Sequence, residues 1–272
     1  MKRMSWFNAT SLTLGFAFLY IPMIVVIIYS FNDNRLVTVW SGFSTKWYGE
    51  LLRNEAFLDA AWVTFKVGFF SSIIATILGT MGAYVLVRGG RFFGRTLFSG
   101  MMYAPLVMPE VITGLSLLLL FISINLDRGI VTIVLAHATF SMCYVSVVVS
   151  SRLVSFDRSV EEAALDLGAT PFEAFRLVTL PIIAPAVISG WLLALTLSLD
   201  DLVIASFVAG PSATTLPIKV FSSIRLGVSP EINALSTILI TIVAVGTITA
   251  SLMTKRAVMR RQRAEQMAEQ SA

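Results

Sequence analysis

The sequence predicts an all-α membrane protein, a polytopic bundle of six transmembrane helices. Of its 272 residues, 56% are apolar and 13% are charged, whereas about a quarter of the residues in a soluble domain are charged. The mean hydropathy is +0.83. The apolar residues gather in six runs, and each is long enough for a helix to cross a ~30 Å hydrocarbon core, which takes about 20 residues.

The six runs and their connecting loops read as one transmembrane domain, residues 1–272. The loops contain the charged residues and most of the turn formers. The first run is too long for the apolar core of a signal peptide and lacks a small-x-small cleavage site, so we expect a retained helix. The spans are placed at residues 12–31, 62–86, 97–124, 130–151, 182–208 and 233–254.

The distribution of Lys and Arg predicts that both termini lie in the cytoplasm. With the N-terminus inside, thirteen of the 20 Lys and Arg residues fall on the inner side and seven on the outer side, and positive charge accumulates in short cytoplasmic loops. This orientation makes residues 152–181 a cytoplasmic loop. In the first outer loop, residues 45–60 fit either a short amphipathic surface helix or an ordered loop with aromatic residues at headgroup level.

The loop 152–181 carries signals for a first short helix. Ser159 and Glu162 have the spacing of a capping box, and Gly168 suits the left-handed residue that ends a helix. Small side chains on one face would let a partner approach closely, although they can also pack only against the ends of this protein's own helices. That face carries Ala163, Ala164 and Leu167.

A second short helix is expected in the same loop. Thr170 and Glu173 form another capping box. Pro171 occupies the first helical position, where its missing N–H has no cost. Leu180-Pro181 is expected to stop this helix where the next span begins. The loop therefore reads as a rigid helix-turn-helix element.

Three acidic residues fall inside the predicted spans, namely Glu110, Asp200 and Asp201. An acid at the bilayer centre costs about 2.5–3.5 kcal/mol on insertion scales, so such residues usually face a cavity or a partner. Straight helices, rising about 1.5 Å per residue, place all three in the outer half of the membrane. We expect them to line a path that attracts cations, with Tyr103 offering a ring face to ammonium groups.

Each acid also has a structural alternative. Glu110 follows an expected break over residues 105–109 and can complement the dipole of a helix in its first turn. Either aspartate can pair with a basic residue of the following loop, Lys219 or Arg225.

No arrangement of residues indicates catalysis or a metal site. His137 is the single histidine, and a hydrogen-bonded interior role is favoured over a proton relay. No Gly-x4-Gly-Lys-Ser/Thr phosphate loop occurs, so an ATPase would be a separate chain. We expect no enzyme activity and no cofactor in this chain. The net charge of +4 does not indicate nucleic acid binding.

The spacing Glu162-Ala163-Ala164-x3-Gly168-x9-Val178-x-Leu180-Pro181 resembles the cytoplasmic loop of bacterial ABC-importer permeases. In that family a separate ATPase subunit binds this loop and supplies ATP and Mg. The resemblance implies the type I importer permease fold. It also implies an ATPase-coupling role for Glu162, Ala163, Ala164, Gly168, Leu180 and Pro181.

Longer segments resemble the permease subunits of polyamine importers, namely residues 104–116, 196–207 and 228–235, and residues 36–40 and 47–52 resemble the putrescine type. The resemblance implies a multi-pass protein of the bacterial inner membrane, surrounded by lipid. It implies a heterodimer with a related permease, a cytoplasmic ATPase dimer and a periplasmic polyamine-binding protein. The residues themselves favour neither putrescine nor spermidine.

Other functions remain open at this point. A permease for another solute would share the loop, and a self-contained proton-coupled transporter would use Glu110, His137 and the aspartates. Inverted repeats in the sequence would favour the proton-coupled transporter, and none stands out. A plain membrane anchor leaves the interior acids unexplained. Residues 210–217 are expected to receive a binding protein or gate the path, or to form an ordinary interhelical loop.

Overall fold

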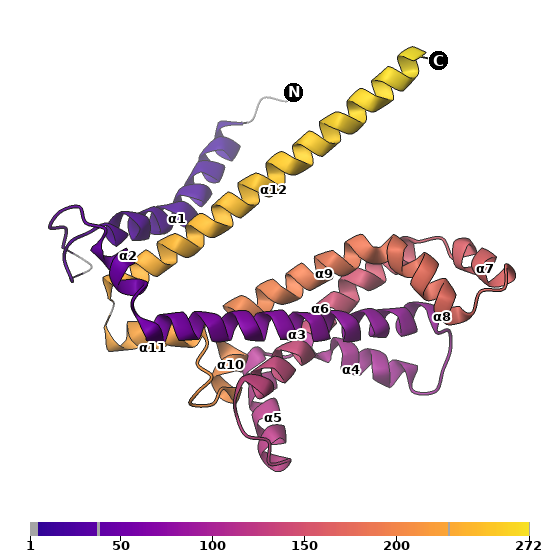
Figure 1. Ribbon diagram of the computed structural model, residues 1–272, viewed down its shortest axis with the longest axis horizontal. Coiled ribbons are helices and arrows are strands. Elements are labelled where there is room, and N and C mark those ends of the chain that lie inside the picture. Colours follow the sequence, from indigo (N-terminus) through magenta and orange to yellow (C-terminus); the bar gives the residue numbers. More distant parts are fainter. Residues whose placement is uncertain (1–4, 37–38, 228, 272) are drawn as a thin grey trace. The chain divides into compact units, whose positions relative to one another are not determined.

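Helices make up most of the chain, as the sequence predicts (Figure 1). The computed structural model describes residues 5–36, 39–227 and 229–271. Over these residues there is no β-strand, only an isolated bridge between Asn32 and Phe43. The helices are α1 (Trp6–Ser30), α2 (Lys46–Leu51), α3 (Glu55–Arg88), α4 (Arg95–Val107), α5 (Glu110–Ser123), α6 (Ile130–Ser155), α7 (Ser159–Asp166), α8 (Pro171–Ala174), η1 (Phe175–Thr179), α9 (Leu180–Asp200), α10 (Val203–Val208), α11 (Leu216–Leu226) and α12 (Pro230–Ser271).

Within the described residues, five helices are long and apolar enough to cross a membrane, or up to six if the bent pair α4 and α5 is one span. The predicted runs all overlap these helices, so the all-α polytopic class is confirmed. The depth argument treated two of these runs as straight helices, and neither is straight. Residues 97–124 are interrupted inside the expected break at residues 105–109, whereas the division of residues 182–208 into α9 and α10 was not expected.

The first departure is a bend of 118° between α4 and α5. Met108 is extended, with φ −75° and ψ 138°. A residue before proline is pushed out of the helical region by the proline ring, so Pro109 ends α4 and starts α5. The break falls inside residues 105–109, where the sequence predicts it. The depth expected for Glu110 assumed a straight helix and no longer applies.

The second departure lies between α9 and α10. Asp201 is extended, with φ −66° and ψ 124°. Its Oδ2 accepts the backbone N–H of Ala205 at 2.7 Å, and its Oδ1 accepts that of Ile204 at 3.3 Å. A side chain that bonds nearby backbone amides competes with helix continuation. Residues 203–208 therefore form a separate helix that starts anew beyond Asp201.

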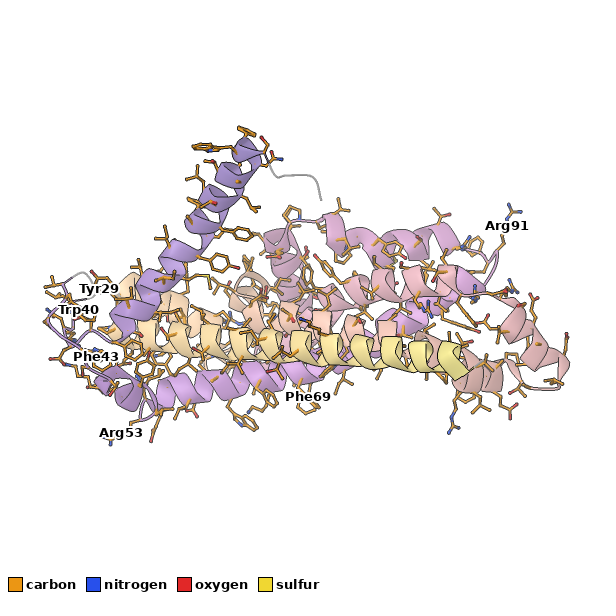
Figure 2. All side chains as sticks on the ribbon, turned by 90° about the horizontal axis from the view of Figure 1, so that it is seen from above. Tyr29, Trp40, Phe43, Arg53, Phe69 and Arg91 are labelled. Carbon is orange, nitrogen blue, oxygen red and sulfur yellow. The ribbon has the colours of Figure 1, made fainter. Side chains whose placement is uncertain are left out.

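The chain divides into two compact units, one of residues 1–55 and 223–272 and one of residues 56–222. In the first, α1 packs against α12, and α2 also contacts α12. The loop before α2 is ordered by buried Asn32, whose carbonyl accepts the Trp47 indole N–H at 2.7 Å. Trp40 of the same loop meets Tyr29 of α1 edge to face (Figure 2).

The surface helix expected over residues 45–60 is shorter than predicted. The helix α2 ends at Leu51, and α3 begins at Glu55 after a turn. Trp47 and Leu51 are buried. The loop before α2 holds Trp47 through the Asn32 carbonyl, and α2 also packs on α12, so Trp47 and Leu51 face the interior of the protein rather than its surface.

The second unit is built around α3, α6, α9 and α10. One cluster of buried side chains includes Val67, Ile133 and Ile204. Another joins α3, α6 and α9, and α6 runs beside α9 in Figure 1. Gly79 allows close packing of α3 on α6, because an added Cβ would overlap the Met142 carbonyl oxygen.

Candidate functional site

The polar loop between α6 and α9 is an ordered helical element. Its first helix, α7, ends at Gly168, which has φ +91°. The amide of Ala169 donates to the carbonyl of Ala164 at 3.1 Å, which closes the turn. Glycine adopts this left-handed conformation without the penalty that a Cβ brings. The predicted turn at Gly168 is confirmed.

The predicted capping box at the start of α7 is wrong. Ser159 is the first helical residue, and no side chain at the preceding position caps the helix. Instead, Asp157 Oδ1 accepts the Ser159 amide at 3.0 Å. These bonds from the Ser159 amide, and then from its hydroxyl, lower the pKa of the Asp157 carboxyl below its ordinary value of 3.8. The start of α7 is thus held by an acid two residues upstream.

The second helix begins as predicted. Thr170 accepts the Glu173 amide, and the Glu173 carboxylate accepts the Thr170 amide at 2.8 Å, so the capping box is present. Pro171 occupies the start of α8. Its missing N–H leaves no amide unsatisfied at this position.

Leu180-Pro181 does not stop the second helix, in contrast to the prediction. The chain stays helical from α8 through the π-helical segment η1 into α9. Proline inside an α-helix removes one hydrogen bond and clashes with the carbonyl four residues earlier. The π-helical turn lies immediately before Pro181, and such turns occur as short bulges within otherwise continuous helices. The wider turn accommodates the proline, so the helix continues through it.

The loop exposes both its motif residues and a set of large apolar side chains. Glu162, Ala163, Gly168 and Pro181 are exposed, whereas Ala164 and Leu180 are half-buried. Exposed apolar side chains on a polar loop are typical of a protein-docking surface. They are Leu165 (43% exposed), Leu167 (90%), Phe172 (69%) and Leu177 (68%).

A buried ion pair ties α7 to the helices beside it, and the sequence reading missed it. Glu161 Oε2 lies 2.8 Å from Arg88 Nε, and both side chains are about one-tenth exposed. The contact is a charge pair rather than an aligned hydrogen bond, since the Arg88 Nε hydrogen has no aligned acceptor. Glu161 Oε1 accepts the Thr179 hydroxyl at 2.7 Å. We call Arg88, Glu161 and Thr179 the loop brace.

The aspartate pair lies at the end of α9, and its two members differ. Asp200 is exposed. The side chain of Asp201 is only 10% exposed, and its Oδ2 lies 3.0 Å from His137 Nε2. The predicted pairing partners were Lys219 and Arg225, but the ion-pair partner that the structure gives Asp201 is His137. The expectation of a hydrogen-bonded interior histidine is confirmed.

The other two predicted path residues occupy different places. Glu110 is exposed in the first turn of α5. Gly114, one turn further along α5, packs closely against Ile204 and Phe207 of α10. The short helix that Asp201 caps therefore touches α5 one turn from Glu110.

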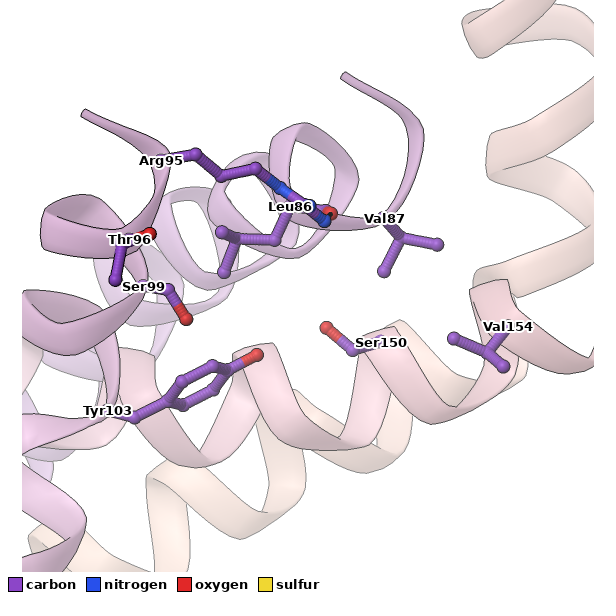
Figure 3. A pocket seen from close by; sticks show the side chains of 8 residues that line it. All are labelled: Leu86, Val87, Arg95, Thr96, Ser99, Tyr103, Ser150 and Val154. Carbon is purple, nitrogen blue, oxygen red and sulfur yellow. Dashed lines mark hydrogen bonds between the residues drawn. The ribbon is translucent and has the colours of Figure 1, made fainter. Parts of the chain in front are cut away.

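Tyr103 faces an open cleft of about 620 Å³ between the end of α3, α4 and α6. The hydroxyls of Tyr103 and Ser150 both point into it, while Arg95 extends across it to Leu86 (Figure 3). The Arg95 guanidinium donates to the Leu86 carbonyl at 2.7 Å. The acids on α5 and α9 do not line this cleft, because Tyr103 precedes the sharp bend after α4.

These features define a multi-pass membrane protein with an ordered polar loop that exposes apolar side chains, and with acids at helix breaks. The chain belongs to the family described as binding-protein-dependent transport system inner membrane component, whose profile matches residues 75–263. The match includes the loop, α9 and the acid pair.

Two groups of relatives share most of the chain. The putrescine transport system permease protein PotI of Escherichia coli (strain K12) is 61% identical over 235 residues, 84% of each chain. The spermidine/putrescine transport system permease protein PotC of the same organism is 42% identical over 244 residues, 90% of this chain and 92% of that one. The predicted resemblance to polyamine importer permeases is confirmed by these relatives.

Solved structures show the same fold. A bacterial ABC transporter involved in the import of the acidic polysaccharide alginate has a TM-score of 0.71 at 19% identity, covering 91% of this chain and 94% of that one. The alginate transporter in complex with its pentasaccharide-bound periplasmic protein has a TM-score of 0.67 at 17% identity, covering 87% and 88%. The predicted importer permease fold is confirmed.

Proposed function

We propose that this chain is a pore-forming subunit that carries putrescine or a related polyamine across the bacterial inner membrane, driven by ATP hydrolysed in another chain. The observation that carries the substrate class is the 61% identity to the putrescine permease over 84% of the chain. Interior acids at helix ends agree with a cationic substrate, because a carboxylate attracts ammonium groups and repels anions.

The proposed assembly contains a related companion permease, a cytoplasmic ATPase dimer that holds ATP and Mg, and a periplasmic polyamine-binding protein. The family description supports the binding protein. The apolar side chains exposed on the loop support the docking of another protein. The Lys and Arg distribution supports the orientation with both termini in the cytoplasm, where the ATPase would reach the loop.

We assign ATPase coupling to the residues of the family motif, which are Glu162, Ala163, Ala164, Gly168, Leu180 and Pro181. The continuous helical segment from Pro171 to Asp200 supports this role. It starts in the docking loop and ends at the acid pair. A displacement of the loop by the ATPase would move this segment as one rod, because the Gly168 turn and the loop brace leave the loop little freedom.

For the substrate path, we assign Asp200 the direct contact with an ammonium group. Its carboxylate is exposed, whereas that of Asp201 is engaged by backbone amides and His137. Glu110 is a second exposed acid, on the helix that packs against α10. Tyr103 would contact substrate in the separate cleft beside α4, where its ring and hydroxyl are accessible.

The test is ATP-dependent uptake of labelled putrescine into proteoliposomes. They would contain this chain, its companion permease, the ATPase and the binding protein, with spermidine, lysine and maltose as unlabelled competitors. Competition by spermidine, but not by lysine or maltose, is the expected result. ATP hydrolysis without polyamine uptake would overturn the substrate class and leave the coupling role intact.

A further inference from the structure

A chain of buried polar groups crosses the interior beside the acid pair. Ser71 of α3 donates its hydroxyl to Ser198 of α9 at 3.0 Å. Ser198 Oγ lies 2.6 Å from His137 Nδ1, and His137 Nε2 lies 3.0 Å from Asp201 Oδ2. The side chains of Ser71, His137 and Ser198 are almost fully buried. The connection therefore runs from α3 through α9 and α6 to the start of α10.

One arrangement of hydrogens satisfies every group in this chain. A carboxylate only accepts hydrogen bonds, so the hydrogen on the His137 ring belongs on Nε2, facing Asp201. His137 Nδ1 then accepts the hydroxyl of Ser198, whose oxygen accepts the hydroxyl of Ser71. A fully satisfied polar network in a low-dielectric interior is rigid, because a buried polar group that loses its partner is costly.

The network meets the backbone where α9 ends. Asp201 Oδ2 takes both the His137 hydrogen bond and the Ala205 amide, while Oδ1 takes the Ile204 amide. Asp201 is therefore fixed to α6 on one side and to the first turn of α10 on the other. Asp200, its neighbour in the chain, remains exposed.

We propose that His137 is a positioning residue that fixes the break between α9 and α10, so that Asp200 is presented to the substrate cation while Asp201 is held back. This inference rests on the proposed import function and goes beyond it, because His137 acts through Asp201 and touches no substrate. Without the His137–Asp201 contact, the junction between α9 and α10 is free to move. The Asp200 carboxylate then no longer has one fixed direction toward the substrate.

The experiment compares three substitutions at His137 in the reconstituted complex, with uptake and ATP hydrolysis measured together. In His137→Gln the amide N–H can still reach Asp201. In His137→Asn the shorter side chain can meet Ser198 but not Asp201, and His137→Leu keeps volume and loses both bonds. We expect substrate transported per ATP to fall about tenfold in the Asn and Leu variants, as for a buried group that loses its partner. The Gln variant should stay within about threefold of wild type.

This pattern separates positioning from a role in stability alone. A purely structural histidine would lower the amount of assembled complex and its ATPase rate without changing transport per ATP. Rescue by Gln and not by Asn identifies the Asp201 side of the ring as the one that matters. Equal losses in the Gln and Asn variants would overturn the proposal.

A double-mutant cycle with Asp201→Asn supplies the decisive outcome. If His137 acts through Asp201, the His137→Leu, Asp201→Asn double variant should transport about as poorly as either single variant, both about tenfold below wild type. Multiplied losses of about a hundredfold would mean independent roles and would overturn the proposal. Uptake by the wild-type complex is measured separately: no putrescine uptake refutes the substrate class, whereas the cycle can be read with any solute that is carried.

Discussion

The carboxylate of Glu161 lies 2.8 Å from Arg88 Nε, although Glu161 stands next to the exposed Glu162 in the loop between α6 and α9. Arg88 is the last residue of α3, and its guanidinium also donates to the Phe156 carbonyl at 3.2 Å. Through Thr179, the same carboxylate reaches the π-helical segment before α9. One acidic side chain thus fastens the loop to the two helices that continue into the membrane.

Breaking this contact should loosen the loop from α3. Glu161→Ala leaves the Arg88 charge nearly buried without its partner, which typically costs about 3–5 kcal/mol. We expect a lower temperature of thermal unfolding and fewer substrate molecules carried per ATP. The swapped pair Arg88→Glu, Glu161→Arg should recover part of both losses.

The matched control is Asp33→Asn, which breaks the exposed pair of Asp33 with Lys46 at 2.6 Å. Exposed pairs contribute little because water and salt screen them. An unfolding temperature that drops as far in this control as in Glu161→Ala would show that burial of the loop brace is irrelevant.

Substitution of Gly168 should uncouple ATP hydrolysis from transport. Alanine at a left-handed residue costs about 1–2 kcal/mol, and Gly168→Val adds a branched side chain to the strain. Gly100→Ala is the control, because an added Cβ meets no atom within 4 Å at either position and only Gly168 has a positive φ. Uptake and ATPase activity are measured for Gly168→Ala, Gly168→Val and Gly100→Ala. Normal coupling of ATP hydrolysis to uptake in Gly168→Val would contradict the rigid-loop role.

The two aspartates should respond differently to neutralisation. Asp200→Asn removes an exposed charge, so we expect uptake to fall about tenfold, as for a lost charge-assisted contact, with unchanged thermal unfolding. Asp201→Asn disturbs the bonds to His137 and to the α10 amides, so both uptake and thermal stability should fall. Identical unfolding profiles for the two variants would argue against separate roles.

The start of α7 should weaken in acid. The pKa of Asp157 is lowered in the folded protein by the bonds from the Ser159 amide and hydroxyl. Its stabilising effect is therefore complete above its ordinary pKa of 3.8 and is lost as the pH falls through the lower folded value. The protection factors of the α7 amides, which correct exchange rates for their intrinsic pH dependence, should fall over that range in wild type and show no such step in Asp157→Asn.

Local signals in the sequence predict much of this structure. Apolar runs identify the membrane helices, and Gly168 and the Thr170–Glu173 capping box lie where their spacing indicates. These features depend on neighbours in the chain. The loop brace and the His137–Asp201 contact join residues that are distant in sequence, so no local pattern reveals them. Ser159 differs, because its predicted capping role is replaced by a local bond in which Asp157, two residues upstream, accepts its amide.

The bends follow a similar division. Pro109 carries its own signal, because proline restricts the residue before it, and the break falls where expected. Asp201 carries no such signal, because its effect depends on burial against His137 and on capping α10. Pro181 misleads in the opposite direction, since the chain stays helical from the π-helical segment into α9 across this proline.

The π-helical turn at Phe175–Thr179 has a consequence for the direction in which the far end of α9 points. Each residue of an α-helix turns the chain by about 100°, and a π-helical turn holds one residue more than an α-helical turn. Losing that residue would rotate all of α9 about its axis and carry Ser198 away from His137. The π-helical turn therefore sets which way the acid pair faces around the axis of α9, in addition to the helical connection between the acid pair and the loop.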